Sequence, residues 1–286
     1  MAISPCPETD VIPSCSVART STPVVKKPAL PANRSTNLPV NDAPYAKILY
    51  DDPVTGQRVR SRVISEVGRI AFEACAPIRT FPAYRGRRSH QGRYWFSRSQ
   101  TQVQFESRFE MTALMVMDFD GNATAVSSNP FWLLWPKGTK PVRHAPDFFV
   151  RRRDGSVLIV DVKPAERITD KDRAQHERTR DVCGELGWEY KEFTMLDVIV
   201  ERNLRLLAGY RNPRFAPPGD SGALIAAQVR AAGEQGLRLS ELIDTAALRV
   251  DLTGDRVLCA VYHMLWGAKI HVDLNCPLTW NTVVRA

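Results

Sequence analysis

The sequence has no hydrophobic run that approaches the roughly 18 residues of a membrane-spanning helix. Residues 1–15 lack a basic segment followed by a long apolar one, so we expect no secretory signal peptide. The six cysteines are scattered and form no CxxC pair, which argues against a zinc ribbon or a disulfide framework. This cysteine usage favours a reducing compartment, and we expect a cytoplasmic protein.

Basic residues outnumber acidic ones over most of the chain. The formal net charge is +8. Residues 215–286 hold six Lys or Arg and seven Asp or Glu, which gives −1, so the other 214 residues carry 33 basic and 24 acidic side chains, or +9. A basic body favours an anionic partner, nucleic acid first, and a merely solvated surface is the alternative.

Acids are absent from residues 79–98, where six arginines are interleaved with aromatic residues. Arginine binds phosphate in a bidentate manner, and aromatic rings stack on bases or pack beneath a strand. We expect the arginines to contact DNA phosphates, and the alternative is a basic hairpin whose aromatic residues face the core. The six are Arg79, Arg85, Arg87, Arg88, Arg93 and Arg98.

Composition and periodicity divide the chain into four parts. Residues 1–44 are rich in Pro, Ser and Thr, and we expect them to be disordered. Residues 45–211 alternate predicted strands and helices, which indicates an α/β domain. Residues 212–222, NPRFAPPGDSG, have the composition of a linker. Residues 223–286 predict three helices followed by β structure, a winged-helix pattern.

Within residues 106–210 the predicted order of elements is α-β-β-β-α-β-α. The first helix ends at Gly121, and the second begins after the N-cap candidate Thr169 and ends at Gly187. In the C-terminal part, Ser240 is the expected N-cap of the second helix, and residues 253–274 are expected to begin as a helix and end as a strand.

Two of the predicted strands carry charges that are costly to bury unless they are paired or bind a metal. In HAPDFFVRRRDGSVLIVDVKPA, residues 144–165, Asp147 opens the first strand, and Asp161 and Lys163 lie at the end of the second. Because residues i and i+2 share one face of a strand, Asp161 and Lys163 point the same way and Val162 points to the other side.

The turn between these strands decides where Asp147 points. A two-residue loop would pair Phe148 with Asp161. In a three-residue loop, Gly155 adopts the left-handed conformation and the numbers of two paired residues add up to 308. This register sets Asp147 opposite Asp161. We expect this longer loop, because it gathers two carboxylates and a lysine on one patch.

Two adjacent carboxylates repel each other unless a positive charge lies between them. Hard cations such as Mg²⁺ take carboxylate and carbonyl oxygens and suit phosphoryl chemistry, and Mn²⁺ is a second candidate. The lysine can orient or deprotonate an attacking water, or stabilise charge on the phosphate. Glu106 and Glu110, one helical turn apart, are the candidates for a third acid. His144, three residues before Asp147, could contact phosphate, but we expect a loop histidine. Gln175 and His176 could line the site, but we expect them on a helix surface.

These residues resemble a known family. Pro146-Asp147 followed by Asp161–Lys163 matches the PD-(D/E)xK nuclease signature. Together with FESRFE, APDFFV, RDG and VDVKPA, they resemble TnsA, the endonuclease subunit of heteromeric transposases. The resemblance covers about residues 79–210, and the C-terminal winged-helix pattern agrees with the second domain of that family.

The resemblance implies a restriction-endonuclease-like core, with a mixed sheet flanked by helices, that cuts DNA at the 5′ ends of a transposable element. It implies as partners a DDE-family transposase and an AAA+ ATPase regulator, in a bacterial cytoplasm. Glu110, Asp147 and Lys163 match the catalytic residues of the family. TnsA has Gln at the position of Asp161, so Asp161 adds a metal ligand to a set that includes Asp147, Glu110 and the backbone carbonyl of Val162.

Two other functions are compatible with these residues. One is a stand-alone restriction or repair nuclease of the same superfamily, which would cut well without partners. The other is a DNA-bound adaptor that retains the fold without the chemistry. The adaptor is disfavoured because all four site positions carry usable side chains.

Overall fold

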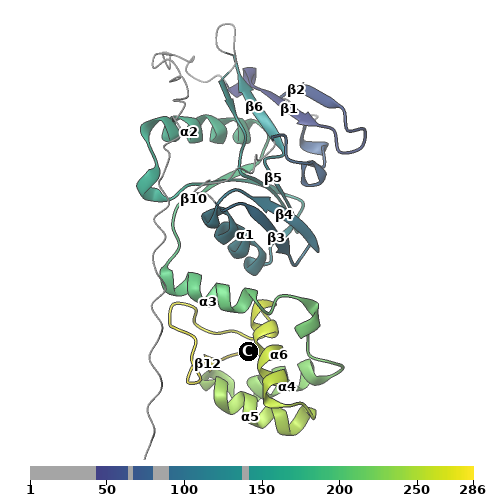
Figure 1. Ribbon diagram of the computed structural model, residues 1–286, viewed down its shortest axis with the longest axis vertical. Helices are drawn as coiled ribbons and strands as arrows, with labels where there is room; N and C mark the ends of the chain where they lie inside the picture. Colours follow the sequence, from purple (N-terminus) through teal and green to yellow (C-terminus); the bar gives the residue numbers. More distant parts are fainter. Residues whose placement is uncertain (1–42, 64–66, 80–89, 137–141) are drawn as a thin grey trace, which may run out of the picture. The chain divides into compact units, whose positions relative to one another are not determined.

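The computed structural model describes residues 43–63, 67–79, 90–136 and 142–286, all within one compact unit, Leu38–Ala286 (Figure 1). Of the segment expected to be disordered, residues 1–44, all but the last two lie outside these ranges. No helix in the described ranges has both the length and the apolar character needed to cross a membrane.

The central sheet is mixed, as expected for an α/β protein. Its four strands follow the order β10-β9-β8-β5, and β9 runs antiparallel to β8 and parallel to β10. Because β9 has a partner on each side, the charges near its end do not lie on an edge strand. The bounds are β5 (Ala123–Ser128), β8 (Phe148–Arg152), β9 (Val157–Val162) and β10 (Glu189–Phe193).

A second four-stranded sheet, in the order β2-β1-β6-β7, and the separate hairpin β3–β4 complete the β structure of this part. The turn Asp52–Gly56 joins β1 to β2, and Asp52 Oδ1 accepts hydrogen bonds from Val54 N and Thr55 N. The bounds are β1 (Lys47–Asp51), β2 (Arg58–Arg62), β3 (Gly92–Phe96), β4 (Thr101–Phe105), β6 (Phe131–Trp135) and β7 (Val142–His144).

The helices begin and end largely at the predicted residues. Ser107 Oγ accepts a hydrogen bond from Glu110 N at the start of α1, and Gly121 ends this helix with φ of 72°. Thr169 forms a capping box with Asp172 at the start of α2, as predicted. The longer helices are α1 (Arg108–Asp120), α2 (Asp170–Glu185), α3 (Val198–Ala208), α4 (Ser221–Ala231), α5 (Leu239–Val250) and α6 (Gly254–Trp266).

Short 3₁₀ helices lie in several of the connections between these elements. They are η1 (Ala43–Tyr45), η2 (Val67–Arg69), η3 (Phe72–Ala74), η4 (Ala165–Arg167), η5 (Pro213–Phe215) and η6 (Gly233–Gln235).

Two helices cover opposite faces of the central sheet. Leu158 and Val160 of β9 pack in the same apolar cluster as Leu114 of α1. Ile159 of β9 packs in a second cluster with Val182 of α2. The alternation of side chains along a strand therefore turns even-numbered residues of β9 toward α1 and odd-numbered residues toward α2.

The predicted order of elements omitted two strands. The structure has β5 between α1 and β6, and β7 between β6 and β8. β5 has the sequence ATAVSS, whose small and polar residues give no alternating apolar pattern, and β7 has only three residues. Tertiary pairing with β8 and β6 forms these strands, so local sequence did not reveal them.

The C-terminal part differs from the prediction at two points. α5 begins at Leu239, and its N-terminus is held by a 3.3 Å hydrogen bond from Arg238 N to Glu241, so Ser240 lies inside the helix and is not its N-cap. The strand expected after α6 is reduced to one bridge between His271 and Arg285. The two-stranded sheet there pairs β11 (Leu237–Arg238) with β12 (Val283–Val284).

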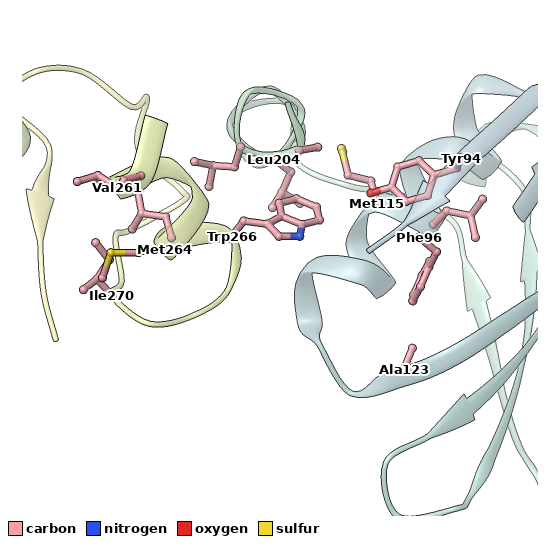
Figure 2. Packing of buried hydrophobic residues seen from close by; sticks show 14 of the residues in the cluster. Tyr94, Phe96, Met115, Ala123, Leu204, Val261, Met264, Trp266 and Ile270 are labelled. Carbon is pink, nitrogen blue, oxygen red and sulfur yellow. The ribbon is translucent and has the colours of Figure 1, made fainter. Parts of the chain in front are cut away.

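One apolar cluster extends from α1 through α3 into the C-terminal helices (Figure 2). Leu204 of α3 lies between Met115 of α1 and Trp266 of α6 in this view. The ring of Trp266 also meets Phe119, with centroids 5.4 Å apart. The C-terminal helices therefore share their core with α1 and α3, and experiments on either part require the full chain.

The β8–β9 hairpin has the register that the sequence predicted. Phe148 pairs with Val160 and Arg151 with Val157, so paired positions sum to 308. Gly155 has φ of 81°, and its N–H donates to Arg152 O at 3.0 Å. The same register, extended by one residue beyond β8, places Asp147 opposite Asp161.

Two glycine substitutions test whether Gly155 fixes this turn. A Cβ at Gly155 or at Gly184 of α2 meets no atom within 4 Å, so only the backbone conformation separates the two sites. Gly155→Ala should lower the free energy of unfolding by roughly 1–2 kcal/mol, because an L side chain is strained at positive φ. Gly184→Ala should raise it by about 0.5–1 kcal/mol. Urea denaturation measures both, and a change of the same sign in both variants would contradict the account.

Candidate functional site

Asp147 lies just before strand β8 and beside the end of strand β9. Its backbone N–H donates to Asp161 Oδ1 at 3.2 Å, and its own Oδ2 accepts from Val162 N at 2.7 Å. The carbonyl of Asp147 accepts from Asn129 N at 2.9 Å. These backbone contacts fix a partly buried carboxylate beside a second one.

Asp161 is the second carboxylate, and it is 3% exposed. It faces the α2 side of the sheet, where Tyr190 of β10 donates from its hydroxyl at 2.9 Å. His144 Nε2 lies 2.8 Å from Asp161 Oδ2 and 3.0 Å from Oδ1. Burial of this extent is incompatible with an exposed ion pair between Asp161 and Lys163.

The environment moves the two carboxyl pKa values apart. Burial raises the pKa of Asp147 well above its ordinary range, and repulsion by Asp161 and Glu110 raises it further. Burial also acts to raise the pKa of Asp161, but the charge and hydrogen bond of His144, with the hydrogen bond of Tyr190, outweigh it and bring this pKa below its ordinary value. Asp161 is thus the stabilised anion, and Asp147 is the acid whose ionisation is costly.

Glu110 approaches from the first turn of α1. Its Oε2 accepts from Glu106 N at 2.7 Å and its Oε1 from the Ser107 hydroxyl at 2.9 Å. Burial raises the pKa of Glu110, and the charge of Glu106 raises it further, while the two hydrogen bonds oppose this. Because Glu110 repels Asp147 and Glu106 forms an ion pair with Arg79, Glu110 is the better of the two candidates for the third acid.

Lys163 shares a strand face with Asp161, and Val162 packs against the α1 cluster on the other side, as predicted. Lys163 Nζ lies 2.6 Å from Oδ2 of Asp172 in the first turn of α2. The hydrogen bond from Lys163 is the main reason that the pKa of Asp172 is lowered. The lysine is therefore held against the N-terminus of α2.

The donor set fits a hard divalent cation in chemistry but not in arrangement. Carboxylate oxygens are suitable ligands, and the mutual repulsion that raises the pKa of Asp147 is what a cation would relieve. Each of the three carboxylates, however, already accepts hydrogen bonds from the protein. Within the described ranges, no three His, Cys, Asp or Glu side chains are placed to hold one metal ion.

Three of the six predicted DNA-binding arginines lie within the described residues, each in a different environment. Arg79 donates to the side chains of Asn129 and Glu106. Arg98 is partly buried, and a Cβ on Gly121 would come within 2.6 Å of its Nη2. Arg93 of β3 is exposed. The remaining three lie outside the described residues: Arg85, Arg87 and Arg88.

Two aromatic residues of the arginine-rich stretch face the core. Tyr94 and Phe96 of β3 are buried in the α1 cluster. They are therefore unavailable for base stacking, which agrees with the alternative of a hairpin whose aromatic residues pack inward.

Sequence reasoning missed or misplaced four residues around the site. His144 ends β7 and contacts Asp161, so the prediction of a loop histidine was wrong. His176 is buried and lies 2.7 Å from Glu192 through Nδ1, so it is not a helix-surface residue. Asn129 and Tyr190 were not considered.

Of these four residues, only Asn129 had a local signal. It precedes a proline and adopts φ of 45°, a left-handed conformation that Asn tolerates better than most residues. The partners of His144, His176 and Tyr190 lie 16 to 29 residues away in the sequence, so local patterns could not reveal them.

Neutralising Asp147 tests its electrostatic strain. Asp147→Asn retains an oxygen acceptor for Val162 N and removes the repulsion. A carboxyl whose pKa is raised by folding costs stability once the pH exceeds its unfolded pKa of about 3.9. The variant should therefore gain stability over the wild type as the pH rises from about 4 toward 8 in metal-free buffer. Each unit of elevation corresponds to about 1.4 kcal/mol.

Asp154→Asn is the matched control for that measurement. Asp154 lies in the same hairpin, is exposed, and has its pKa lowered by hydrogen bonds from Ser156. This variant should gain no stability as the pH rises. Urea midpoints across the pH range give both curves, and an Asp147→Asn variant less stable than wild type at every pH would contradict the account.

Comparisons with known proteins identify no relative from which the function of the site could be inferred. No family model matches the chain, and no curated protein is significantly similar to it. The inference of function therefore starts from the hairpin end, its carboxylates and its lysine.

Proposed function

We propose that this chain is a metal-dependent DNA endonuclease of the PD-(D/E)xK type that acts as a TnsA-like subunit of a transposase. The observation that carries the proposal is the end of the β8–β9 hairpin. Its register sets Asp147 beside Asp161, with Lys163 two residues further on the same face. Carboxylates and a lysine grouped in this way suit phosphodiester hydrolysis.

The fold around the hairpin supports the proposal. A mixed sheet with an antiparallel hairpin, a parallel β10 and helices on both faces is compatible with a restriction-endonuclease-like core. α1 brings Glu110 to the same end of the sheet, where it repels Asp147. The three helices and two-stranded sheet after residue 220 are compatible with a winged-helix unit.

In this proposal Asp147, Asp161, Glu110 and the backbone carbonyl of Val162 would hold Mg²⁺, or Mn²⁺ in its place, after they rearrange. The ion would supply Lewis-acid stabilisation of the phosphate. Asp147 provides a carboxylate whose ionisation becomes favourable once positive charge is near. Lys163 orients the attacking water or stabilises charge on the phosphate.

Two contacts would have to change before the site acts. Asp161 must give up at least part of its contact with His144, and Lys163 must leave Asp172. The second contact is an ion pair at a partly exposed position, with the side chains of Lys163 34% and Asp172 24% exposed. Its net contribution to the stability of the fold is therefore small, and breaking it costs little. An approaching phosphate competes with Asp172 for the same ammonium group.

The transposase role follows from the resemblance and extends the proposal. The chain would cut at the 5′ ends of a transposable element, in a bacterial cell, beside a DDE-family transposase that acts at the 3′ ends and an AAA+ ATPase regulator. The C-terminal part carries a net charge of −1 over residues 215–286, which disfavours it as the main DNA contact. We assign it to partner binding, and the exposed side chains of Leu248 and Trp280 lie on it.

A cleavage assay with paired variants tests the enzymatic proposal. Asp147→Asn and Lys163→Ala should each lower the rate of Mg²⁺-dependent strand cleavage by on the order of 10²-fold or more, because each removes a group that stabilises the transition state. Asp154→Asn, in the same hairpin, should cut like the wild type. DNA affinity should stay unchanged in Asp147→Asn and Asp154→Asn, and should fall only by the loss of one phosphate contact in Lys163→Ala.

Partner dependence separates the subunit from a stand-alone nuclease. The wild-type protein should cut transposon-end DNA poorly alone and well with the transposase encoded beside it. Efficient cutting without any partner would favour a restriction or repair enzyme instead. If Asp147→Asn and Lys163→Ala cut like the wild type, the catalytic assignment is wrong.

A further inference from the structure

A cleft of 780 Å³ lies next to the candidate site. One wall is formed by the start of α1, with Ser107, Arg108 and Phe109, and the other by the segment after β9, with Pro164, Glu166 and Arg167. The loop after β10 forms the remainder of the lining with Thr194, Met195 and Leu196, and His90 lies at the side of α1.

The cleft directly adjoins the residues proposed for catalysis. Pro164 follows Lys163 in the sequence, and Glu110 follows Phe109 on α1. A strand of DNA whose scissile phosphate reached Lys163 would continue along one of the surfaces beside it, and this cleft is such a surface.

The charged groups in the cleft favour an anion. Arg108 and Arg167 are both exposed and come from opposite walls. Arg108 contacts His90 Nε2 at 3.2 Å, and within the described part of the chain neither arginine forms an ion pair. Glu166 is the one acid among the lining residues, so two guanidinium groups face a single carboxylate.

The apolar part of the cleft suits a sugar rather than a free phosphate alone. Met195 is 74% exposed, although it is a large apolar side chain. Phe109 is partly buried and its ring is supported by Phe193, with centroids 5.0 Å apart. A lining of arginines and apolar side chains is complementary to a sugar-phosphate backbone, which alternates charged and apolar groups.

We propose that this cleft binds the backbone of a DNA strand next to the scissile phosphate, with Arg108 and Arg167 contacting phosphates from its two walls. Phe109 and Met195 lie under the deoxyribose or base between these contacts. The proposal rests on the proposed function for the direction of the strand, but DNA binding in the cleft is measurable without cleavage.

Binding of duplex DNA to the full chain, measured by fluorescence anisotropy in EDTA over a range of NaCl concentrations, tests the cleft directly. Arg108→Ala with Arg167→Ala should weaken binding to all sequences. It should also flatten the slope of log K against log salt by roughly 0.9 for each lost phosphate contact. Arg153→Ala with Arg249→Ala removes the same charge from exposed positions outside the cleft and should leave the slope near that of wild type.

A lysine variant separates charge from folding defects. Arg108→Lys with Arg167→Lys keeps both positive charges and should retain most of the salt slope, while equal urea midpoints for all variants would show that folding is intact. If the cleft pair and the control pair bind DNA alike, or the wild type binds no DNA, the proposal is overturned. If the cleft pair alone weakens binding and the wild type still cuts nothing, the cleft stands and the proposed catalysis fails.

Discussion

The repulsion between Asp147 and Asp161 is the constraint around which this part of the molecule is arranged. A three-residue turn at Gly155 sets the register that brings the two carboxylates together. Burying two negative charges side by side is unfavourable, and hydrogen-bond donors from several elements offset part of this free energy. Asn129 holds the backbone of Asp147, while His144 and Tyr190 hold the side chain of Asp161. Strand β7 of the second sheet and the parallel strand β10 thus both supply hydrogen-bonding side chains to the end of the β8–β9 hairpin.

These contacts stabilise the charged side chains of the candidate site in the absence of a metal ion and DNA. Asp161 is satisfied by protein donors, and Lys163 is paired with the capping carboxylate of α2. Of the three carboxylates, Asp147 has the most strongly raised pKa, because it is buried and is also repelled by Asp161 and Glu110. The unfavourable electrostatic energy of the site is therefore concentrated on the carboxyl group of Asp147, and a bound cation would lower it.

Local sequence signals predicted the scaffold of the site well. The turn at Gly155, the N-cap at Thr169 and the helix end at Gly121 each depend on residues within a few positions, and each was predicted. The two carboxylates could be aligned because strand alternation and loop length are also local. Ser240 was wrong as an N-cap because the pairing of β11 with β12 and the Arg238–Glu241 contact start α5 earlier.

The partners of the carboxylates could not be predicted in the same way. His144 and Tyr190 reach Asp161 from strands 17 and 29 positions away in the sequence, and β5 and β7 form only through tertiary pairing. The ion pair of Lys163 with Asp172 also depends on how α2 returns over the sheet. These contacts set the resting arrangement of the carboxylates, which local sequence patterns could not predict.

The most direct test of this account is a titration of the metal-free protein with Mn²⁺, followed by electron paramagnetic resonance of the free ion in the absence of DNA. The wild type is predicted to bind Mn²⁺ at the hairpin end, and Asp147→Asn to bind it roughly tenfold or more weakly, since it loses a direct ligand. Asp154→Asn should bind like the wild type. Equal binding by wild type and Asp147→Asn, or no binding by the wild type, would contradict the claim that these carboxylates form a cation site.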